Sequence, residues 1–282
     1  EELWKSDGTA SGTVMVKDIN SGSDGSSPED LIAVGNTLYF TADDGTNGRE
    51  LWKSDGTEAG TVMVKDINSG SGSSVYGGGS DEALCKVFDN TLYFRATDGT
   101  NGRELWKSDG TASGTVMVKD INSGSDSSHP TYLAVFNNEL YFSASDGIGS
   151  GGGNGEELWK SDGTDAGTVM VKDINVGSHS SPQQLIVVDN TLFFTAHVDG
   201  NGRELWKSNG TESGTMMVKD INGVGAQSYP DYLTAFGNNL YFRADDGTSS
   251  SGNNGTELWK SDGTASGTVM VKDIYTGSAD SY

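Results

Sequence analysis

Three short loops carry side chains that could bind a metal ion. Residues 44–48 and 98–102 both read Asp-Gly-Thr-Asn-Gly, and residues 199–202 read Asp-Gly-Asn-Gly. Carboxylate, amide and carbonyl oxygens in a glycine-bent loop are the ligands that calcium prefers. Asp-Gly and Asn-Gly also form ordinary hairpin turns, so a turn without metal is the alternative. The candidate calcium ligands are Asp44, Asn47, Asp98, Asn101, Asp146, Asp199 and Asp246.

Catalytic groups are harder to find. The histidines, His129, His179 and His197, fall in polar segments and are expected to be solvated. The acidic residues recur along the chain, which predicts equivalent sites or none rather than one catalytic centre. Arg95 and Arg243 stand where other repeats have Thr or Ser, and we expect them to form salt bridges between repeats. No catalytic residue is predicted, and the chain is expected not to be an enzyme.

The six tryptophans could stack on sugar rings, because an aromatic face suits a pyranose. All six lie in one recurring motif, Glu-Leu-Trp-Lys-Ser-Asp-Gly-Thr, which favours packing in a core. Its Asp-Gly-Thr part is typical of a turn in which Asp accepts backbone hydrogen bonds, and Asn209 replaces that Asp in one copy. The Glu of the motif and the Lys of the following Val-Lys-Asp are expected to pair across strands or between repeats.

The spacing of the motif sets the architecture. It recurs with a period of 47 to 54 residues, which suggests a repeat fold. In the period that starts at Pro28, short apolar runs bounded by Gly, Asn, Asp and Ser predict strands at 30–34, 37–42, 49–54 and 61–67. Four antiparallel strands in about 50 residues match one blade of a β-propeller. The predicted fold is therefore an all-β propeller of four-stranded antiparallel blades, with five complete blades and a half-blade at the N-terminus.

The repeats define the predicted boundaries. The chain is expected to be one repeat domain, residues 1–282, and part of a longer chain. The half-blade spans residues 1–19, and the blades span about 28–67, 81–121, 130–174, 182–221 and 230–274. A half-blade presents an open sheet edge, which native proteins cover. A closed five-blade ring with an extra hairpin, or pairing of the half-blade with another copy, are the alternatives.

Composition excludes some partners. The formal net charge is −22 and the pI is about 4.2, so nucleic acids and anionic membranes are poor partners. No apolar run approaches the roughly 18 residues that a spanning helix needs, so membrane insertion is not expected. The single cysteine, Cys85, lies in an apolar segment and is expected to be a small core residue.

The recurring Glu-Leu-Trp-Lys-Ser-Asp-Gly-Thr motif resembles that of the bacterial ELWxxDGT repeat family, and the resemblance covers essentially the whole chain. Members of that family are typically large secreted or surface-associated bacterial proteins that look like propellers. The resemblance thus implies an extracellular or cell-surface location. It implies no catalytic residues.

These observations favour a non-catalytic structural or adhesion module of a bacterial surface or secreted protein, stabilised by calcium. The alternative is a multivalent lectin with equivalent sugar sites on its blades. Glycans, or other copies of the chain bound through the open half-blade, are the expected partners. An enzyme acting on polysaccharide is a third hypothesis, which a unique acidic cluster at one end of the propeller would favour.

Overall fold

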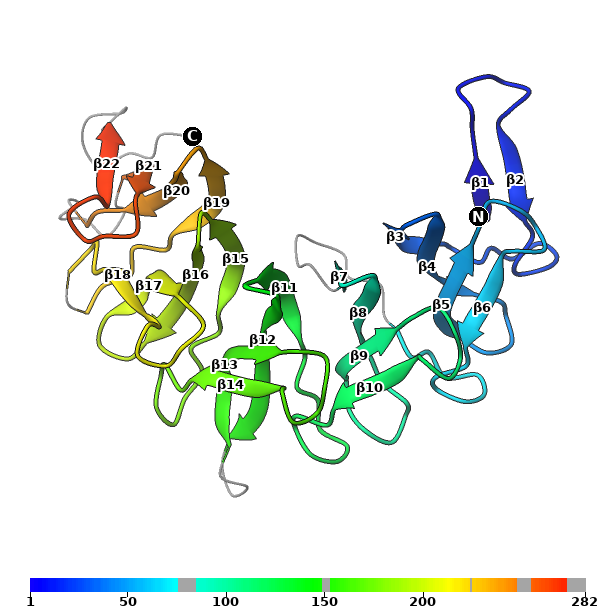
Figure 1. Cartoon of the computed structure of the whole chain (residues 1–282), viewed down its shortest axis with the longest axis horizontal. Coiled ribbons are helices and arrows are strands. Elements are labelled where there is room, and N and C mark those ends of the chain that lie inside the picture. The colour runs from blue at the N-terminus through cyan, green and yellow to red at the C-terminus, as the bar shows by residue number, and fades with distance from the viewer. Residues whose placement is uncertain (76–84, 149–152, 224, 248–254, 273–282) are drawn as a thin grey trace. The chain divides into compact units, whose positions relative to one another are not determined.

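The computed structural model describes residues 1–75, 85–148, 153–223, 225–247 and 255–272. The described chain forms strands and no helix, in one two-stranded and five four-stranded antiparallel sheets (Figure 1). Each four-stranded sheet is a meander in which consecutive strands pair, as in a propeller blade. The predicted fold, a β-propeller with five complete blades and an N-terminal half-blade, is confirmed.

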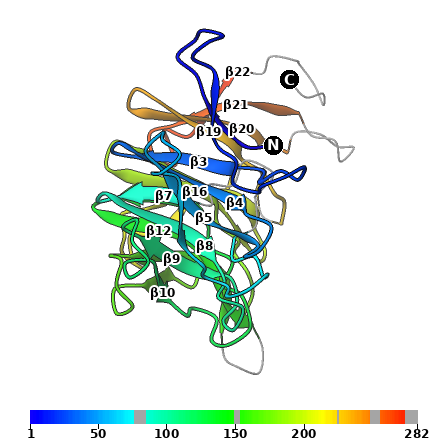
Figure 2. The same ribbon diagram turned by 90° about the vertical axis from the view of Figure 1, so that its right-hand side faces the viewer.

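The half-blade and first two blades have the following strands. The half-blade is the hairpin of β1 (Leu3–Lys5) and β2 (Val14–Lys17), dark blue in Figures 1 and 2. The first complete blade consists of β3 (Glu29–Val34), β4 (Thr37–Asp43), β5 (Arg49–Ser54) and β6 (Val62–Lys65). The second consists of β7 (Cys85–Phe88), β8 (Thr91–Ala96), β9 (Glu104–Ser108) and β10 (Val116–Lys119). Its predicted beginning at residue 81 lies outside the described residues.

Three further blades follow. The third consists of β11 (Thr131–Phe136), β12 (Glu139–Ile148), β13 (Asn154–Ser161) and β14 (Val169–Lys172). The fourth consists of β15 (Gln183–Val188), β16 (Thr191–Val198), β17 (Gly202–Ser208) and β18 (Met216–Lys219). The fifth consists of β19 (Asp231–Phe236), β20 (Asn239–Asp245), β21 (Thr256–Ser261) and β22 (Val269–Lys272).

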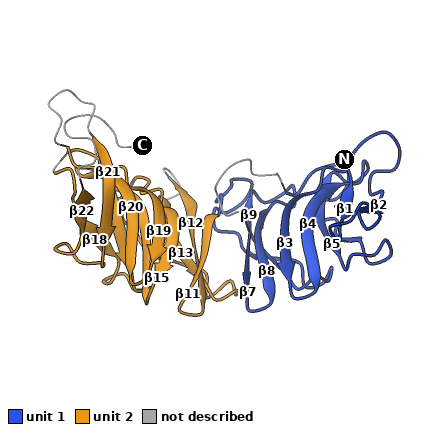
Figure 3. Ribbon diagram, turned by 90° about the horizontal axis from the view of Figure 1, so that it is seen from above, with its two compact units in different colours: residues 1–130 blue, residues 131–282 orange. Residues whose placement is uncertain are grey.

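The chain divides into two compact units, residues 1–130 and 131–282 (Figure 3). Unit 1 holds the half-blade and the first two blades, and unit 2 holds the other three. The single-domain boundaries stay a prediction.

In each unit the core lies between successive blades. The tryptophans of the five complete blades are buried, at 5–7% exposed, whereas Trp4 of the half-blade is 58% exposed. Trp106 packs with Tyr39, Leu51 and Val64 of the preceding blade, and Trp206 packs in the same way against the third blade. The prediction that these residues serve the core is confirmed for the complete blades.

Within each unit, lysines tie one blade to the next by hydrogen bonds to backbone carbonyls. Lys53 Nζ donates to Gly110 O at 2.7 Å, and Lys65 Nζ donates to Thr115 O at 2.8 Å. Lys207 repeats the first contact in unit 2 with Gly263 O at 2.7 Å. These lysines therefore bond to backbone of the following blade and not to a glutamate.

We predict that replacing a buried motif tryptophan is far more damaging than replacing the exposed one. Trp206→Ala should cost about 3–5 kcal/mol of unfolding free energy, because it empties an inter-blade core. Trp4→Ala is the matched control and should change it by roughly 0.5 kcal/mol or less, as at other exposed positions. Urea unfolding checks both, and equal losses would contradict the packing described above.

Candidate functional site

The glutamates of the Glu-Leu-Trp motifs in the five complete blades are buried, and four of them bond to the segment that leads to the next blade. Glu104 accepts hydrogen bonds from Ile121 N at 2.9 Å and from Ser128 N at 2.8 Å, and the Ser128 hydroxyl donates as well. Glu50, Glu157 and Glu204 have the same partners in their own blades. The predicted pairing of this glutamate with lysine is wrong. The carboxylate instead satisfies backbone donors that would otherwise be buried without a partner.

Burial dominates the titration of these glutamates. It raises the pKa of Glu104, Glu157 and Glu204 to about 7, although the bonds from serine hydroxyls and backbone N–H groups oppose the shift. A perturbed pKa in a cleft is a common mark of an active site. Here the same shift recurs from blade to blade with the same partners, so it belongs to the framework.

The Asp-Gly-Thr segments are turns, as predicted. Asp55 Oδ1 accepts hydrogen bonds from Thr57 N at 2.9 Å and from the Thr57 hydroxyl at 2.7 Å. Asn209 keeps both bonds in the copy that lacks Asp. The repeated polar residues are thus engaged in the framework, and a unique site must be made from positions that differ among blades.

Such positions gather at the start of the innermost strand in four of the five complete blades, and the corresponding start in the second blade lies outside the described residues. A bulge shifts the register there, and its first residue has a left-handed backbone: φ is 54° at Asp30, 55° at Tyr132, 55° at Gln184 and 53° at Tyr232. Non-glycine residues adopt this conformation at a cost of roughly 1 kcal/mol or more. Because this left-handed conformation recurs, the structure of the blade must impose it, while the side chain at the position differs between blades.

A second variable position lies on the neighbouring strands. In the first blade, Arg49 Nη1 of β5 donates to the Thr41 hydroxyl of β4 at 3.2 Å. Arg203 makes the same bond to Thr195 in the fourth blade, also at 3.2 Å. In the third blade the pair becomes Glu156 and Ser143, with the serine donating at 2.9 Å.

The fifth blade exchanges the two residue types, with Arg243 on β20 and Thr256 on β21. Arg243 forms a two-pronged ion pair with Asp231 of its own blade, at 3.0 and 2.7 Å. The predicted inter-blade salt bridge of Arg243 is therefore wrong.

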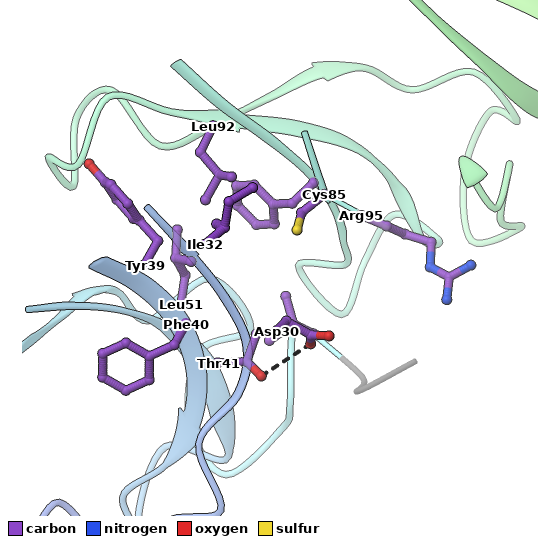
Figure 4. A pocket seen from close by; sticks show the side chains of 11 residues that line it. Asp30, Ile32, Tyr39, Phe40, Thr41, Leu51, Cys85, Leu92 and Arg95 are labelled. Carbon is purple, nitrogen blue, oxygen red and sulfur yellow. Dashed lines mark hydrogen bonds between the residues drawn. The ribbon is translucent and has the colours of Figure 1, made fainter. Parts of the chain in front are cut away.

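Unit 1 contains a small pocket between its first and second complete blades. Figure 4 shows its lining, with Asp30 and Thr41 on one side and Ile32, Cys85 and Leu92 on another. The pocket encloses about 30 Å³ and is mostly apolar, with Arg95 among its lining residues. It is too small for a sugar ring, so a larger ligand would lie across its mouth.

Asp30 is the titratable acid of this pocket. Burial raises the pKa of its carboxyl group, and the nearby Glu29 acts in the same direction. A hydrogen bond from the Thr41 hydroxyl at 3.3 Å, together with Arg49 and Arg95, opposes the increase. Asp30 is nevertheless an exposed residue at the rim, so its proton can be transferred to a bound molecule.

Cys85 also lines the pocket and is half-buried. Burial raises the pKa of its thiol, and the charge of Asp30 adds to this. A thiol with a raised pKa is a poor nucleophile. The expectation of a small residue packed against the core is met, since Cys85 contacts the cluster around Trp106.

Unit 2 displays tyrosines at the start of its innermost strands. Tyr229 and Tyr232 are 58% and 71% exposed, and Tyr132 is half-buried. The guanidinium of Arg243 lies 5.0 Å from the centre of the Tyr232 ring. Tyr132 and Tyr229 both interact electrostatically with Arg203, whose pKa is lowered by burial. Aromatic and arginine side chains from three blades therefore share one surface.

The predicted calcium loops are closed by their own hydrogen bonds. Asp44 Oδ1 accepts from the backbone N–H groups of Thr46 and Asn47, at 2.9 and 2.8 Å, and Oδ2 accepts from the Asn47 amide at 2.7 Å. Asp98 and Asn101 repeat this arrangement, and Asp146 bonds to Asn154 and Gly155. Asp199 contacts His197 at 3.3 Å, and Asp246 follows the end of β20.

These bonds agree with the alternative of a plain turn. In the part of the chain that is described, no three His, Cys, Asp or Glu side chains are grouped so that they could hold a metal ion. Calcium binding stays a prediction. No described helix is long and apolar enough to cross a membrane.

Sequence reasoning missed both variable sites because it looked for repeated chemistry. The signal that could have found them is variation at one position of the repeat. The residues that follow Pro28, Pro182 and Pro230 differ between blades, while the Glu-Leu-Trp motif stays constant. The histidines illustrate the loop environment, since His179 Nδ1 accepts the Glu156 backbone N–H at 2.9 Å.

Comparisons with known proteins extend the description of the fold. No family model and no curated protein matches the chain. Puromycin hydrolase is 13% identical over 90% of this chain, with a TM-score of 0.48. An α-L-arabinofuranosidase from Clostridium thermocellum is 14% identical over 86% of this chain and 93% of its own, with a TM-score of 0.34. An exo-β-1,3-galactanase from Phanerochaete chrysosporium is 11% identical over 95% of this chain and 65% of its own, with a TM-score of 0.34.

The chain spans about 40% of the length of the puromycin hydrolase that it matches. The matched proteins are enzymes, which contradicts the prediction of a non-catalytic structural or adhesion module and the expected lack of enzymatic activity. At these identities and TM-scores this chain's own activity has to be argued from its residues.

We predict that Glu104→Gln lowers the unfolding free energy by about 1–3 kcal/mol, because an amide group would turn one acceptor toward backbone donors into a donor. Glu58→Gln, an exposed turn position, is the control and should have little effect. Thermal unfolding of both variants checks this. Equal melting temperatures for the two would show that the buried carboxylate does not hold the blades.

The same glutamates predict a pH dependence. A folded-state pKa of about 7 exceeds the ordinary value of 4.5, so the stabilisation from the bound proton is full below about pH 4.5 and is lost as the pH rises through 7. We expect the melting temperature to fall between pH 5 and 8, and to fall less in a Glu104→Gln, Glu157→Gln double variant. An unchanged slope in that variant would assign the effect to the general negative charge.

Proposed function

We propose that this chain is the propeller of an enzyme that hydrolyses glycans, with Asp30 as the general acid. The observation that carries the proposal is the position of Asp30, a carboxyl group that a bulge with a left-handed backbone holds at a pocket rim. The other blade starts that the structure describes have Tyr132, Gln184 and Tyr232 at this position. Burial raises its pKa, so it keeps its proton closer to neutral pH than an ordinary aspartate.

The neighbouring carboxylate supports this assignment. Glycoside hydrolysis commonly needs two acidic side chains, one to protonate the leaving oxygen and one to act as base or nucleophile. Glu29 directly precedes Asp30 and lies 3.6 Å from Arg49 in an ion pair. Arg49 lies beside the Glu29 carboxylate, whereas the Asp30 carboxyl group is partly buried. These different environments allow one group to act as the acid and the other as the base or nucleophile. Glu29 is the candidate for the second role.

Other hydrolytic chemistry fits the pocket less well. Attack on a peptide or ester by a side chain needs an activated nucleophile with an adjacent base. The one thiol of the pocket, Cys85, has a raised pKa, and the described lining contains no histidine. Carboxyl acid–base chemistry is what the pocket residues can supply, and the glycosidic bond is a substrate that such chemistry cleaves.

We predict that the chain releases new reducing ends from a plant or microbial polysaccharide and that Asp30→Asn lowers the rate by about 10²–10⁴-fold, the usual share of a general acid. Asp89→Asn, in an exposed hairpin turn, is the control with the same chemical change. The assay is a reducing-end measurement over a panel that includes arabinan, β-1,3-galactan and xylan. No release by the wild type, or an Asp30→Asn rate within twofold of the control, would refute the proposal.

The pH profile separates catalysis from structural support. A general acid works when protonated, so activity should fall as the pH rises through the raised pKa of Asp30. Asp30→Asn should lack this limb in its residual rate. If Asp30 only supports the inter-blade contact, its replacement would lower the melting temperature and leave the profile of the remaining activity unchanged.

A further inference from the structure

The three blades of unit 2 display one surface that the proposed acid of unit 1 does not use. We define the tyrosine surface as Tyr132, Tyr229 and Tyr232 together with Arg203, Arg243 and Gln184. These residues come from the starts of β11, β15 and β19, the segment before β19, and the adjoining strands β17 and β20. The inner strands β11, β15 and β19 are neighbours in unit 2, so the set is local.

The exposed rings are held in place rather than left free. Asp231 fixes Arg243 by two hydrogen bonds, and Arg243 in turn lies over Tyr232 at 5.0 Å. A guanidinium beside an aromatic face is attracted to the ring and restrains it. The Tyr232 backbone is set in the left-handed region by the bulge. A preorganised exposed aromatic loses little entropy when a ligand stacks on it.

Polar groups that can contact hydroxyls surround the rings. Arg203 Nη1 is anchored by Ser181 O at 2.9 Å and by the Thr195 hydroxyl at 3.2 Å. Gln184 Oε1 accepts the backbone N–H of Leu233 at 3.1 Å, which fixes its amide group at the contact between the fourth and fifth blades. Anchored planar donors beside apolar rings match the alternation of hydroxyl edges and C–H faces on a sugar.

We propose that the tyrosine surface binds a segment of the glycan substrate, with Tyr232 and Tyr229 as stacking platforms. This inference rests on the proposed glycan-directed function and adds the residues that hold the polysaccharide. The same side chains do not recur in every blade of unit 2, since Gln184 stands where Tyr132 and Tyr232 stand in the adjacent blades. Unit 2 therefore carries one surface of this kind and not an equivalent site on each blade.

The ligand class follows from charge as well as shape. Stacking on tyrosine would also suit nucleic-acid bases. A chain with a formal net charge of −22 repels a phosphate backbone, however. A polysaccharide offers the same ring faces without that repulsion.

The test measures binding without turnover, in the Asp30→Asn background and at low temperature, by affinity electrophoresis through gels containing arabinan, β-1,3-galactan or xylan. Adding Tyr232→Ala should weaken retention by about tenfold, and adding Tyr229→Ala should weaken it further. Phe236→Ala is the matched control, because Phe236 is a 73% exposed aromatic at the other end of β19. It should leave retention unchanged.

The outcomes distinguish this inference from the proposed activity. Retention that Tyr232→Ala and Phe236→Ala affect equally, or that neither affects, overturns the tyrosine surface and leaves the acid of unit 1 standing. Absence of retention by every polysaccharide overturns both. Tyrosine-dependent binding of a peptide mixture in place of polysaccharide would overturn the glycan assignment of the surface. Urea unfolding of each variant verifies that the blades remain folded.

Discussion

The buried carboxylate of the Glu-Leu-Trp motif is the interaction on which the blades depend. The connection between two blades must enter the core, where its backbone N–H groups lose water. One glutamate side chain accepts bonds from the end of its own last strand, as at Ile121, and from the start of the next blade, as at Ser128. Since an unpaired buried donor costs about 1–3 kcal/mol, this single side chain determines where each new blade begins. The glutamate therefore belongs with Trp and Lys to the framework.

Because the repeated residues satisfy one another's hydrogen bonds, the residue type at other positions can vary. Lys53 and Lys65 bond to carbonyls of the next blade, and Asp55 closes its own turn, so none of them needs a ligand. The bulge at the start of the innermost strand uses backbone geometry and tolerates Asp30, Tyr132 or Gln184 alike. Side chains can change there without disturbing the inter-blade core. Rigid blades thereby position variable groups, the division of labour expected where a scaffold carries function.

The fold could be predicted because its determinants are local and repeated. Alternation of apolar runs with Gly and Asn turns located strands such as Arg49–Ser54 to the residue. The role of Glu104 could not be found in this way, because its partners lie 17 and 24 residues away, in segments that become neighbours only when the blades pack. The Asp30 pocket has the same origin, since Cys85 and Arg95 come from the next blade. The sequence pattern shows the periodicity within a strand, but it does not show which side chains from two blades come into contact.

Lysine and arginine side chains also differ in role, the lysines belonging to the framework and the arginines to the variable positions. Every lysine except Lys86 lies in a repeated Glu-Leu-Trp-Lys or Val-Lys-Asp segment. Most of those whose bonds are described hold adjacent blades through carbonyl oxygens, as Lys53, Lys65 and Lys207 do. Lys160 instead pairs with Glu139 of its own blade, at 3.1 Å. The arginines lie on or directly before the two middle strands of a blade. The fifth blade exchanges the strand that carries one, because it has Arg243 where the fourth blade has Thr195. A lysine ammonium is a point charge suited to a single carbonyl, whereas a guanidinium presents a planar fork to several acceptors. Four blades have a guanidinium group at this level, although the strand that carries it varies. Packing does not require it, because the third blade has Glu156 in its place. The arginines therefore mark the end of the blades at which a ligand is best sought.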